Sequence, residues 1–406
     1  MKVIRELCAF DQRGPGTDAE RRAANALATR LRGMGRRAEL EPFFSHPQYA
    51  VVHLVHAALG IAGSLLAIVQ PAAGFALVLF AAASTYLDLN TRLYLVRSLL
   101  FRRVSQNVVS PGPRPDAPAR LVLMAHYDAA RTGYLFSRGA KRIRRLPERS
   151  RVLLGPFRIF FWLGLAPLLP ILGARMAGLD PTWLNALQAI PTIVLIVAAF
   201  LLIDIALSDT VPGAYDNASG VAAVLAAGEE LTADPPDNLD VWIVLTGSEE
   251  SLCEGSRAFV RSRRKQLDRA RTYFLNVDSV SSGQVAYEVS EGAVISIPLD
   301  RLLVELAEAL AAGDAAMPIR HPVLDDALPP RVRKFRSITI RTTDERGNLA
   351  PWYHTLEDTP ERVDLAALAR ATDFVTALAR LLDREQGRTA GAPAPSSPTA
   401  SAAQRV

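Results

Sequence analysis

The chain has 406 residues, enough for two or three domains, and half of them are hydrophobic. This share is high for a soluble protein in which 21% of the residues are charged, so we expect membrane-spanning segments. The formal net charge is +5, and the two cysteines, Cys8 and Cys253, are far apart and lack metal-ligand spacing. Nothing therefore indicates a disulfide framework or a cysteine zinc site, which fits a reducing compartment. The first residues lack the long apolar core of a secretory signal peptide.

Residues 14–44 predict a turn, a helix and a strand. Thr17 or Asp18 is suited to cap the helix, its apolar residues recur on one face, and the glycine-containing segment 33–35 ends it. Residues 38–43 alternate in the manner of an edge strand. We interpret this part of the chain as structural.

Two pairs of long apolar segments come next. The first pair covers residues 49–69 and 72–89, and the second covers residues 157–173 and 183–207. Each segment is close to the roughly 20 residues that a helix needs to cross a bilayer, so we predict two transmembrane hairpins. Pro167 and Pro170 make the third helix irregular, and Arg158 marks its end near the lipid headgroups. The alternative is that these segments are buried core helices of a large soluble protein.

Basic residues flank the hairpins on one side. They are Arg92, Arg97, Arg102, Arg103, Arg138, Lys141, Arg142, Arg144, Arg145, Arg149 and Arg151. The short connections on the far side carry almost none, so the positive-inside rule predicts that the termini and the polar motifs face the cytoplasm. Nucleic-acid binding is the alternative role, but these residues adjoin apolar segments and lack interleaved aromatic residues, which suits anionic headgroups better.

Polar residues follow four apolar runs of strand length. Residues 121–125 precede His126 and Asp128, residues 241–245 precede Glu249 and Glu250, residues 273–277 precede Asp278, and Trp352 and Tyr353 precede His354. Continuous apolar runs are typical of parallel strands, whose carboxyl ends carry the functional sites of such sheets. The pattern therefore predicts a parallel sheet that gathers these side chains at one edge.

A further acid, Asp216, lies in a Gly-flanked turn at residues 213–220, directly before a helix expected over residues 219–231. The turn can place the carboxylate at the mouth of the helix, where negative charge is favoured. Taken alone, the same pattern is also that of an ordinary helix cap.

The residue types together indicate a metal site. Carboxylates and imidazoles suit zinc, and two such ions about 3.5 to 4 Å apart can hold a water between them and polarise a carbonyl. In this hypothesis Asp216 bridges the ions, His126 and Asp278 complete one, and Glu250 and His354 complete the other. Each residue alone also has a structural interpretation, as a strand-end His, a helix cap or a surface residue, and their joint occurrence favours the metal site.

Two neighbouring acids have other expected roles. Asp128 lies two residues after His126 on the same strand face, where it can accept the imidazole N–H and fix its tautomer. Glu249 and Glu250 are adjacent and point in different directions. One of them can therefore coordinate while the other stays free as a general base.

In order and spacing these pieces resemble the co-catalytic zinc peptidases of family M-28, which include bacterial leucyl aminopeptidases and glutamate carboxypeptidases. The matching pieces are Gly14-Pro15-Gly16-Thr17, Ala125-His126-Tyr127-Asp128, the turn at 213–220, Gly247-Ser248-Glu249-Glu250 with Gly255-Ser256, Asn276-Val277-Asp278, and Tyr353-His354-Thr355 with Glu357-Asp358-Thr359. The resemblance covers the chain outside the hairpins and the tail. It implies an α/β fold with a mixed, mostly parallel central sheet flanked by helices, into which two transmembrane hairpins are inserted.

The resemblance also implies a role for each matching residue. It implies His126, Asp216, Glu250, Asp278 and His354 as zinc ligands, Glu249 as general base and Asp128 as the orienting acid. In relatives the peptide bond after the bridging Asp is usually cis, which we expect at Asp216-Asn217. The chain departs from the family pattern in its two hairpins, which enter and leave on the same side, and at Leu252 and Ser279, which bear on the specificity pocket and leave the ligands in place.

These inferences give an expected organisation. A peptidase domain is built from residues 1–48, 90–151 and 208–385, transmembrane hairpins cover 49–89 and 152–207, and a disordered tail rich in Pro, Ala and Ser covers 386–406. The basic residues Arg320, Arg331, Arg333, Lys334, Arg336 and Arg341 either grip a substrate carboxylate or form a solvated face.

The expected function is that of a membrane-anchored exopeptidase, an aminopeptidase, that uses two zinc ions and Glu249 as base. Its partners are a peptide or aminoacyl-amide substrate and the lipid bilayer, with no nucleic acid. Two alternatives stay open: a non-peptidase amide hydrolase or aminoacyl cyclase on the same scaffold, and a catalytically inactive membrane receptor or chaperone.

Overall fold

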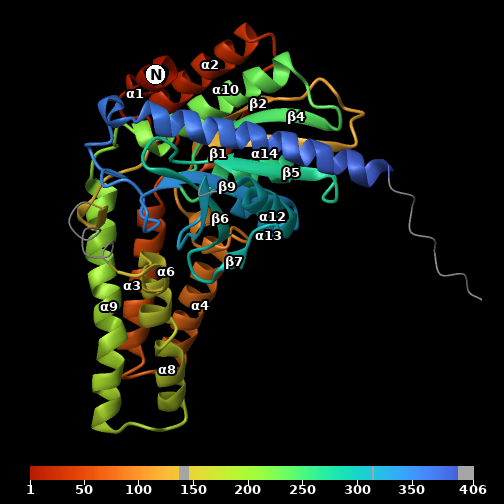
Figure 1. The fold of residues 1–406 in the computed structure, drawn as a ribbon. Helices are drawn as coiled ribbons and strands as arrows, with labels where there is room; N and C mark the ends of the chain where they lie inside the picture. The colour runs from red at the N-terminus through yellow and green to blue at the C-terminus, as the bar shows by residue number, and fades with distance from the viewer. Residues whose placement is uncertain (137–145, 313–314, 392–406) are drawn as a thin grey trace, which may run out of the picture.

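A mixed β-sheet lies at the centre of the domain at the top of Figure 1. The computed structural model describes residues 1–136, 146–312 and 315–391, and within them the sheet has nine strands in the order β1-β2-β4-β3-β5-β9-β6-β7, with β8 beside β6. The strands are β1 Glu39–Ser45, β2 Arg103–Ser110, β3 Ala119–His126, β4 Leu239–Thr246, β5 Thr272–Val277, β6 Gln284–Glu291, β7 Ile297–Pro298, β8 Ala316–Arg320 and β9 Arg336–Thr343. The inner strands β4, β3, β5 and β9 run parallel. Outside them the pairs are antiparallel except for β6 and β8, which are parallel.

Both faces of the inner strands are buried, because side chains alternate between two apolar cores. In β3, Leu121 and Leu123 belong to one core, and Val122 and Met124 belong to the other. The first face is covered by α1 Lys2–Cys8, α2 Asp18–Gly33, α10 Ser219–Ala233, α12 Arg301–Leu310 and α14 Leu365–Gly391, and the second by α11 Glu254–Ser262 and α13 Leu328–Val332. The predicted sheet flanked by helices is confirmed.

The elements near the N-terminus follow the expected pattern. The Thr17 hydroxyl accepts the main-chain N–H of Glu20 at 3.1 Å and caps α2. Strand β1 lies at the edge of the sheet, where it pairs only with β2 among the described strands. This region gives the sheet one of its covering helices and its outer strand.

Long apolar helices extend from one side of this domain (Figure 1). They are α3 Tyr49–Leu66, α4 Pro71–Leu89, the continuous stretch Pro156–Met176, and α9 Thr182–Leu207. Within the described residues these are four helices long and apolar enough to cross a membrane. The stretch Pro156–Met176 comprises α7 Pro156–Ile159, the π-helical turn η3 Phe160–Leu165 and α8 Leu168–Met176. The wide turn precedes Pro167, whose ring removes a helical N–H donor, so the expected irregularity is present.

Polar contacts inside the helical bundle join elements that are distant in the sequence. The hydroxyls of Ser64 in α3 and Thr192 in α9 lie 2.7 Å apart, and the Gln188 amide donates to the Ser64 carbonyl at 2.6 Å. Arg175 in α8 donates to Gln188 at 2.7 Å. Between apolar helices such hydrogen bonds stabilise one arrangement of the bundle.

Short elements connect the bundle to the domain. They are η1 Arg97–Leu99, α6 Glu148–Leu153 and η4 Ala214–Ala218, while a further short element, η5 Pro360–Arg362, lies inside the domain before α14. Arg158, at the domain end of α7, is buried and donates to the Gly292 carbonyl at 3.0 Å and the Ser296 hydroxyl at 2.8 Å. The loop after β6 therefore holds Arg158.

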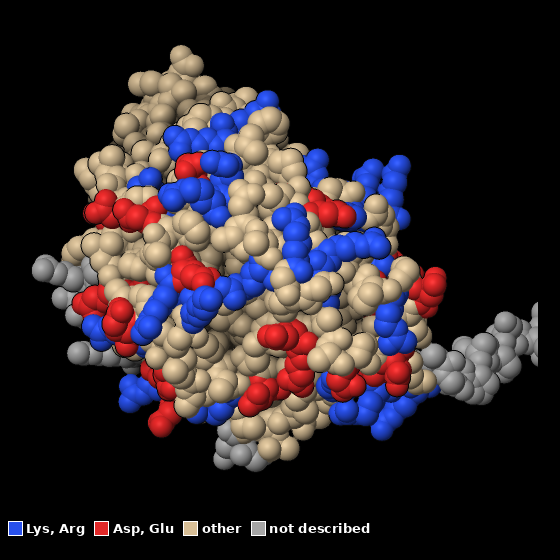
Figure 2. Space-filling view, turned by 90° about the horizontal axis from the view of Figure 1, so that it is seen from above, with Lys and Arg blue, Asp and Glu red and all other residues tan. Residues whose placement is uncertain are grey.

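The domain face that points away from the bundle has a mixed charge. Figure 2, seen from that side, shows Lys and Arg side chains interspersed with Asp and Glu. A patterned surface of this kind is typical of a face in contact with water.

The structure corrects two expectations, and a third concerns residues that lie outside the described ranges. The segment that carries His354 is a series of turns over residues 351–356, and the fourth parallel strand is β9, which alternates polar and apolar residues and therefore lacks a continuous apolar run. Helix α14 continues to Gly391, beyond the expected start of the tail at 386, and residues 392–406 lie outside the described residues. Arg138, Lys141, Arg142, Arg144 and Arg145 also lie outside them.

Candidate metal centre

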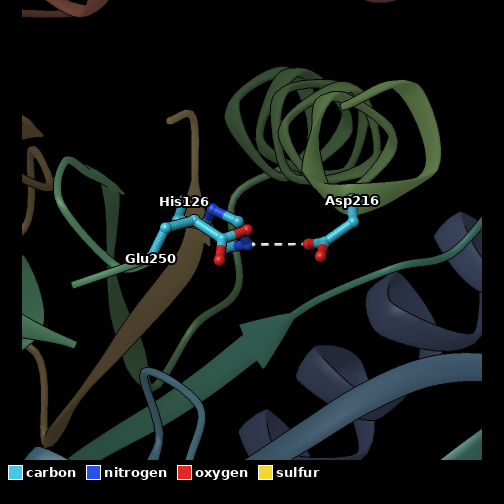
Figure 3. A group of neighbouring side chains, drawn as sticks. All are labelled: His126, Asp216 and Glu250. Atoms are coloured by element: carbon cyan, nitrogen blue, oxygen red, sulfur yellow. Dashed lines mark hydrogen bonds and ion pairs between the residues drawn. The ribbon is translucent and has the colours of Figure 1, made fainter. Parts of the chain in front are cut away.

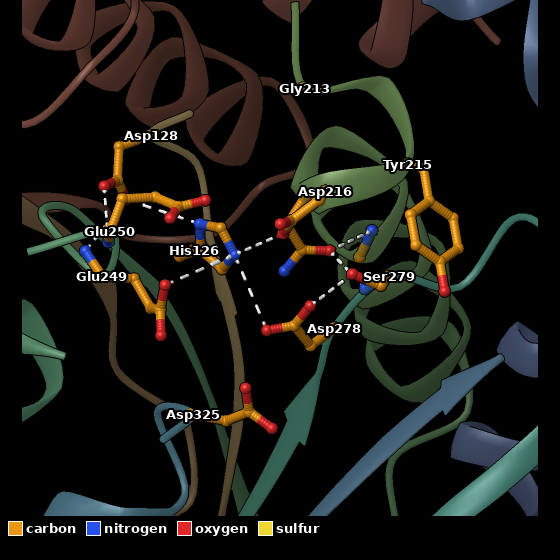
Figure 4. Close-up of polar contacts among 12 residues, drawn as sticks. His126, Asp128, Gly213, Tyr215, Asp216, Glu249, Glu250, Asp278, Ser279 and Asp325 are labelled. Atoms are coloured by element: carbon orange, nitrogen blue, oxygen red, sulfur yellow. Dashed lines mark hydrogen bonds and ion pairs between the residues drawn. The ribbon is translucent and has the colours of Figure 1, made fainter. Parts of the chain in front are cut away.

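Three neighbouring parallel strands bring the first group of candidate residues together. His126 is the last residue of β3, Glu249 and Glu250 follow β4, and Asp278 follows β5. Strand β3 pairs with both β4 and β5 in parallel, so the three carboxyl ends lie at one edge of the sheet. Figure 4 shows their side chains converging there.

The turn that carries Asp216 is held against the end of β5. The peptide bond between Asp216 and Asn217 is cis, as expected. The Asn217 side chain donates to the Val277 carbonyl at 3.0 Å and accepts the N–H groups of Gly220 and Ser279 at 2.9 and 3.0 Å. These bonds fix the carboxylate of Asp216 over the end of the sheet.

Gly213 opens this turn in the left-handed region, with φ of +67°. An added Cβ would lie 2.6 Å from the Asp216 carbonyl oxygen. Only glycine accepts this backbone conformation at low cost while also leaving room for the carbonyl.

Asp216 faces two imidazoles with different oxygen atoms. Its Oδ1 lies 3.1 Å from Nε2 of His126, and its Oδ2 lies 2.8 Å from Nε2 of His354. Asp278 Oδ2 lies 3.6 Å from Nε2 of His126, and Glu250 Oε1 lies 3.5 Å from Nε2 of His354. The five residues expected as ligands thus lie around one space, with Asp216 between two groups.

Figure 3 isolates part of this arrangement. His126, Asp216 and Glu250 come from three separate segments and point toward one another. One donor atom from each lies within 4.8 Å of the others, a spacing at which a single ion could contact all three.

Asp128 lies beside Nδ1 of His126, whereas Asp216 faces Nε2 of the same ring. Asp128 Oδ1 lies 3.5 Å from Nδ1 of His126 and accepts the main-chain N–H of Glu249 at 3.1 Å, while Oδ2 accepts that of Glu250 at 3.0 Å. Asp128 is fully buried. It therefore holds the Glu249–Glu250 loop through two main-chain hydrogen bonds and lies beside the His126 ring (Figure 4).

Glu249 lies beside the expected ligands. Its Oε2 is 3.9 Å from Nε2 of His126, and its Oε1 accepts the Cys253 thiol at 3.3 Å. The residue lines the same cavity as Asp216, Glu250, Asp278 and His354. It is thus placed to exchange a proton with a molecule in that cavity.

The electrostatics of the cluster call for a cation. Burial raises the pKa of Asp278 to about 7 and also raises the pKa of Glu250 and of Glu249. Burial alone would lower the pKa of His354, but the charges of Glu250 and Asp216 raise it to about 10. Buried carboxylates are costly unless they are paired or coordinate metal.

The donor set itself fits zinc. Glu250 Oε1 is buried and has no hydrogen-bond partner among the described residues, and it points toward the space between the imidazoles. Arg341 is already bound to Glu288, at 2.6 Å, and to Asp325. Carboxylate and imidazole donors in a buried cluster are those that zinc prefers.

Some residues near the site had no role assigned in the sequence analysis, which quoted Asp358 only as part of a motif. Asp358 accepts the main-chain N–H groups of Tyr215 and Asp216 at 2.7 and 3.1 Å, and Glu20 accepts that of Ser248 at 2.9 Å. Asp325 lines the cavity. Its sequence signal is a pair of acids, Asp325-Asp326, inside an otherwise apolar stretch.

The expectation that arginines of the segment 290–346 grip a substrate carboxylate is wrong for the cavity described here. Among the described residues that line it there is no Lys or Arg. Arg341 is buried in ion pairs, Arg320 pairs with Glu148, and Arg333 donates to the Thr91 carbonyl at 2.7 Å. These side chains are occupied by structural contacts.

The chain matches known proteins at three levels. Residues 201–379 match the model of peptidase family M28. The curated aminopeptidase YwaD of Bacillus subtilis (strain 168) is 30% identical in an alignment of 185 residues that covers 41% of this chain. This alignment spans only 37% of the relative's length.

Solved structures share the fold at low identity. They include BSAP, a zinc aminopeptidase from Bacillus subtilis, with a TM-score of 0.52, 15% identity and coverage of 93% of each chain. A Bacteroides thetaiotaomicron glutaminyl cyclase bound to N-acetylhistamine also has a TM-score of 0.52 and 15% identity, and the match covers 93% of this chain and 95% of the cyclase chain. The Legionella pneumophila aminopeptidase LapA has a TM-score of 0.51 and 12% identity, and the match covers 94% of this chain and 68% of the LapA chain. At these identities the likeness concerns the fold alone.

Proposed function

Since the chain belongs to peptidase family M28, we propose that it is a membrane-anchored, zinc-dependent exopeptidase that acts as an aminopeptidase. The observation that carries this proposal is the position of Asp216, whose two oxygens face His126 and His354 separately. A carboxylate in this position can bridge two ions. His126 and Asp278 would hold one zinc, and Glu250 and His354 would hold the other.

Zinc bound at this site would polarise the scissile carbonyl and lower the pKa of water there. Glu249 takes the proton of the attacking water and returns it to the leaving amine. Asp128 holds the His126 ring and, through two main-chain bonds, the loop that carries Glu249. Asp358 holds the backbone of Asp216 from the opposite side.

The helical bundle supports the membrane part of the proposal. Large apolar side chains point outward along it, among them Val69, Phe200 and Leu207, which are 76%, 70% and 82% exposed. Exposure of this kind is stable in lipid and costly in water. The chain would thus form one peptidase domain from residues 1–48, 90–151 and 208–385, with hairpins 49–89 and 152–207 crossing the bilayer.

The orientation follows from charge. Arg92, Arg102, Arg103, Arg149 and Arg151 lie in the segments that join the hairpins to the domain. The connection between α3 and α4 carries no Lys or Arg. By the positive-inside rule the domain and both termini face the cytoplasm.

The test uses the full chain purified in detergent and supplied with zinc. Elemental analysis should give about two zinc ions per chain. A panel of fluorogenic aminoacyl amides and a peptide digest should show release of N-terminal residues that stops with a chelator. Bound zinc without any aminopeptidase cleavage would favour an amide hydrolase or aminoacyl cyclase, and a zinc content near zero would favour an inactive receptor or chaperone.

A further inference from the structure

The cavity at the metal centre does not end at the domain. It has a volume of about 370 Å³ and is lined by the candidate site residues, by apolar residues of α7, η3 and α9, and by Tyr49 and His53 of α3. Its lining on α9 begins at Ile193 and ends at Ile205. At 1.5 Å per residue this stripe is about 18 Å long, so the cavity is a groove along the helix.

This groove opens toward the outside of the bundle. Ile193 and Val197 line it and are nevertheless 56% and 53% exposed. They lie on the helix that exposes Phe200 and Leu207 to the same surroundings. If α9 crosses the bilayer, the groove opens sideways into lipid and its inner end reaches the acids.

The groove walls are apolar over most of their length. Along α9 the lining residues are Ile, Val, Leu and Ala, and the facing wall includes Phe157 and Phe160. Away from the acidic end, the polar side chains among the described lining residues are those of Tyr49 and His53. The groove therefore offers hydrocarbon contact and few hydrogen bonds.

We propose that the amide hydrolysed at this site carries a linear hydrocarbon chain, which lies in the groove along α9 and enters it from the bilayer. This inference rests on the proposed hydrolase function and names its substrate class. In the reaction the carbonyl C–N bond breaks, the water oxygen bonds to the carbonyl carbon, and the amine leaves with a proton. The products are a carboxylic acid and an amine, one of which carries the chain.

The walls favour a hydrocarbon chain over an extended peptide. A peptide in the groove would bring main-chain N–H and C=O groups against Ile193, Val197 and Leu201, which cannot bond them. A hydrocarbon chain brings no such groups. A single side chain of a soluble peptide would leave most of the length along α9 empty.

The test compares two chain-length series with the zinc-loaded full chain in detergent micelles. In one series the chain is on the amine side, from leucine ethylamide to leucine tetradecylamide. In the other it is on the acyl side, from N-acetyl-leucine to N-myristoyl-leucine. We expect kcat/KM to rise about three- to four-fold per methylene in one series until the groove is filled. The responding series tells which product carries the chain.

Two variants on α9 link this effect to the groove. Ala198→Trp fills the groove and should reduce the ratio of long-chain to short-chain kcat/KM to near one. Val194→Phe, in the same lining, gives a second and smaller obstruction. Ala189→Trp introduces the same bulk on an exposed position of the same helix outside the lining, and should keep the full ratio. Thermal unfolding and zinc content show whether each variant is folded.

The outcomes separate the two proposals. A flat response in both series, or faster cleavage of soluble leucine-rich peptides, together with zinc-dependent cleavage of short aminoacyl amides, overturns the chain proposal and leaves the exopeptidase. Equal loss of the ratio in Ala198→Trp and Ala189→Trp also overturns it. If no amide in either series or among the peptides is hydrolysed by zinc-loaded protein, both proposals fail.

Discussion

Arg97 and Asp88 form a two-pronged ion pair where the first hairpin meets the sheet domain. Arg97 donates from Nε and Nη2 to the two carboxylate oxygens at 2.8 and 2.7 Å, and both side chains are fully buried. Its Nη1 donates to Glu254 of α11 at 2.7 Å. One guanidinium thus ties α4 to the domain that carries the candidate site.

Removing this guanidinium should destabilise the protein strongly. Arg97→Ala leaves Asp88 and Glu254 buried without their partner, a change that typically costs about 3 to 5 kcal/mol. We expect a marked fall in the midpoint of thermal unfolding in detergent. Arg97→Lys should have an intermediate unfolding midpoint, because a lysine ammonium cannot form the two parallel hydrogen bonds that the guanidinium donates to Asp88. Arg301→Ala, which removes only an exposed pair with Glu305, is the control and should leave the midpoint unchanged. Equal midpoints for Arg97→Ala and the control would contradict the structural role of Arg97.

Glu249→Gln should remove turnover and keep zinc. The amide has nearly the same shape but cannot take a proton from water, so kcat should fall by about 10² to 10⁴. Zinc content should stay at the wild-type value, because Glu249 is not among the expected ligands. Elemental analysis and kinetics on one aminoacyl amide check both statements. Retained activity would exclude Glu249 as the base.

Asp128→Asn should weaken both metal binding and catalysis. The amide offers one acceptor oxygen, whereas Asp128 uses two to accept the N–H groups of Glu249 and Glu250. Changes to residues that orient a ligating His typically cost about 10- to 100-fold in affinity or activity. Zinc competition with a chromogenic chelator measures this. An affinity equal to wild type would mean that Asp128 does not position His126.

Metal removal should lower stability through the same residues. A ligand at 1,000 times its dissociation constant stabilises the folded state by about 4 kcal/mol. Chelation of the wild-type protein should therefore lower its unfolding midpoint, and re-addition of zinc should restore it. Asp216→Asn should abolish most of this zinc-dependent shift, because the residue faces both ligand groups. Glu249→Gln should keep the shift. A full shift in Asp216→Asn would place the zinc elsewhere.

Cysteine labelling should report the orientation in the membrane. The two native thiols are poor targets, since Cys253 is buried and burial raises the pKa of the Cys8 thiol to about 11. With a membrane-impermeant maleimide, Gln70→Cys, in the exposed connection between α3 and α4, should react in intact cells. Lys265→Cys, on the exposed surface of the domain, should react only after permeabilisation. The reverse pattern would invert the topology, and labelling of both in intact cells would contradict spanning hairpins.

The sequence alone predicted the strands and helices whose apolar residues form a recognisable local pattern. Continuous apolar runs before His126, Glu249 and Asp278 identified β3, β4 and β5, and the long apolar segments identified the helices of the bundle. Parallel strands place their carboxyl ends at one edge, so the grouping of these residues followed from the strand prediction. His354 was included on the assumption that Trp352 and Tyr353 end a fourth apolar strand, but its segment is a series of turns and not a strand.

Only the tertiary structure decided which atoms face one another and what surrounds them. That Asp216 presents Oδ1 to His126 and Oδ2 to His354, and that Asp358 holds its backbone, depends on segments about 140 residues apart meeting at one edge. The groove along α9 likewise requires that helix to pack beside α7 and η3 with one stripe left uncovered. Sequence periodicity shows which face of a helix is apolar, but contact between faces is set by packing, and so the route from the bundle to the acids appears only in the folded chain.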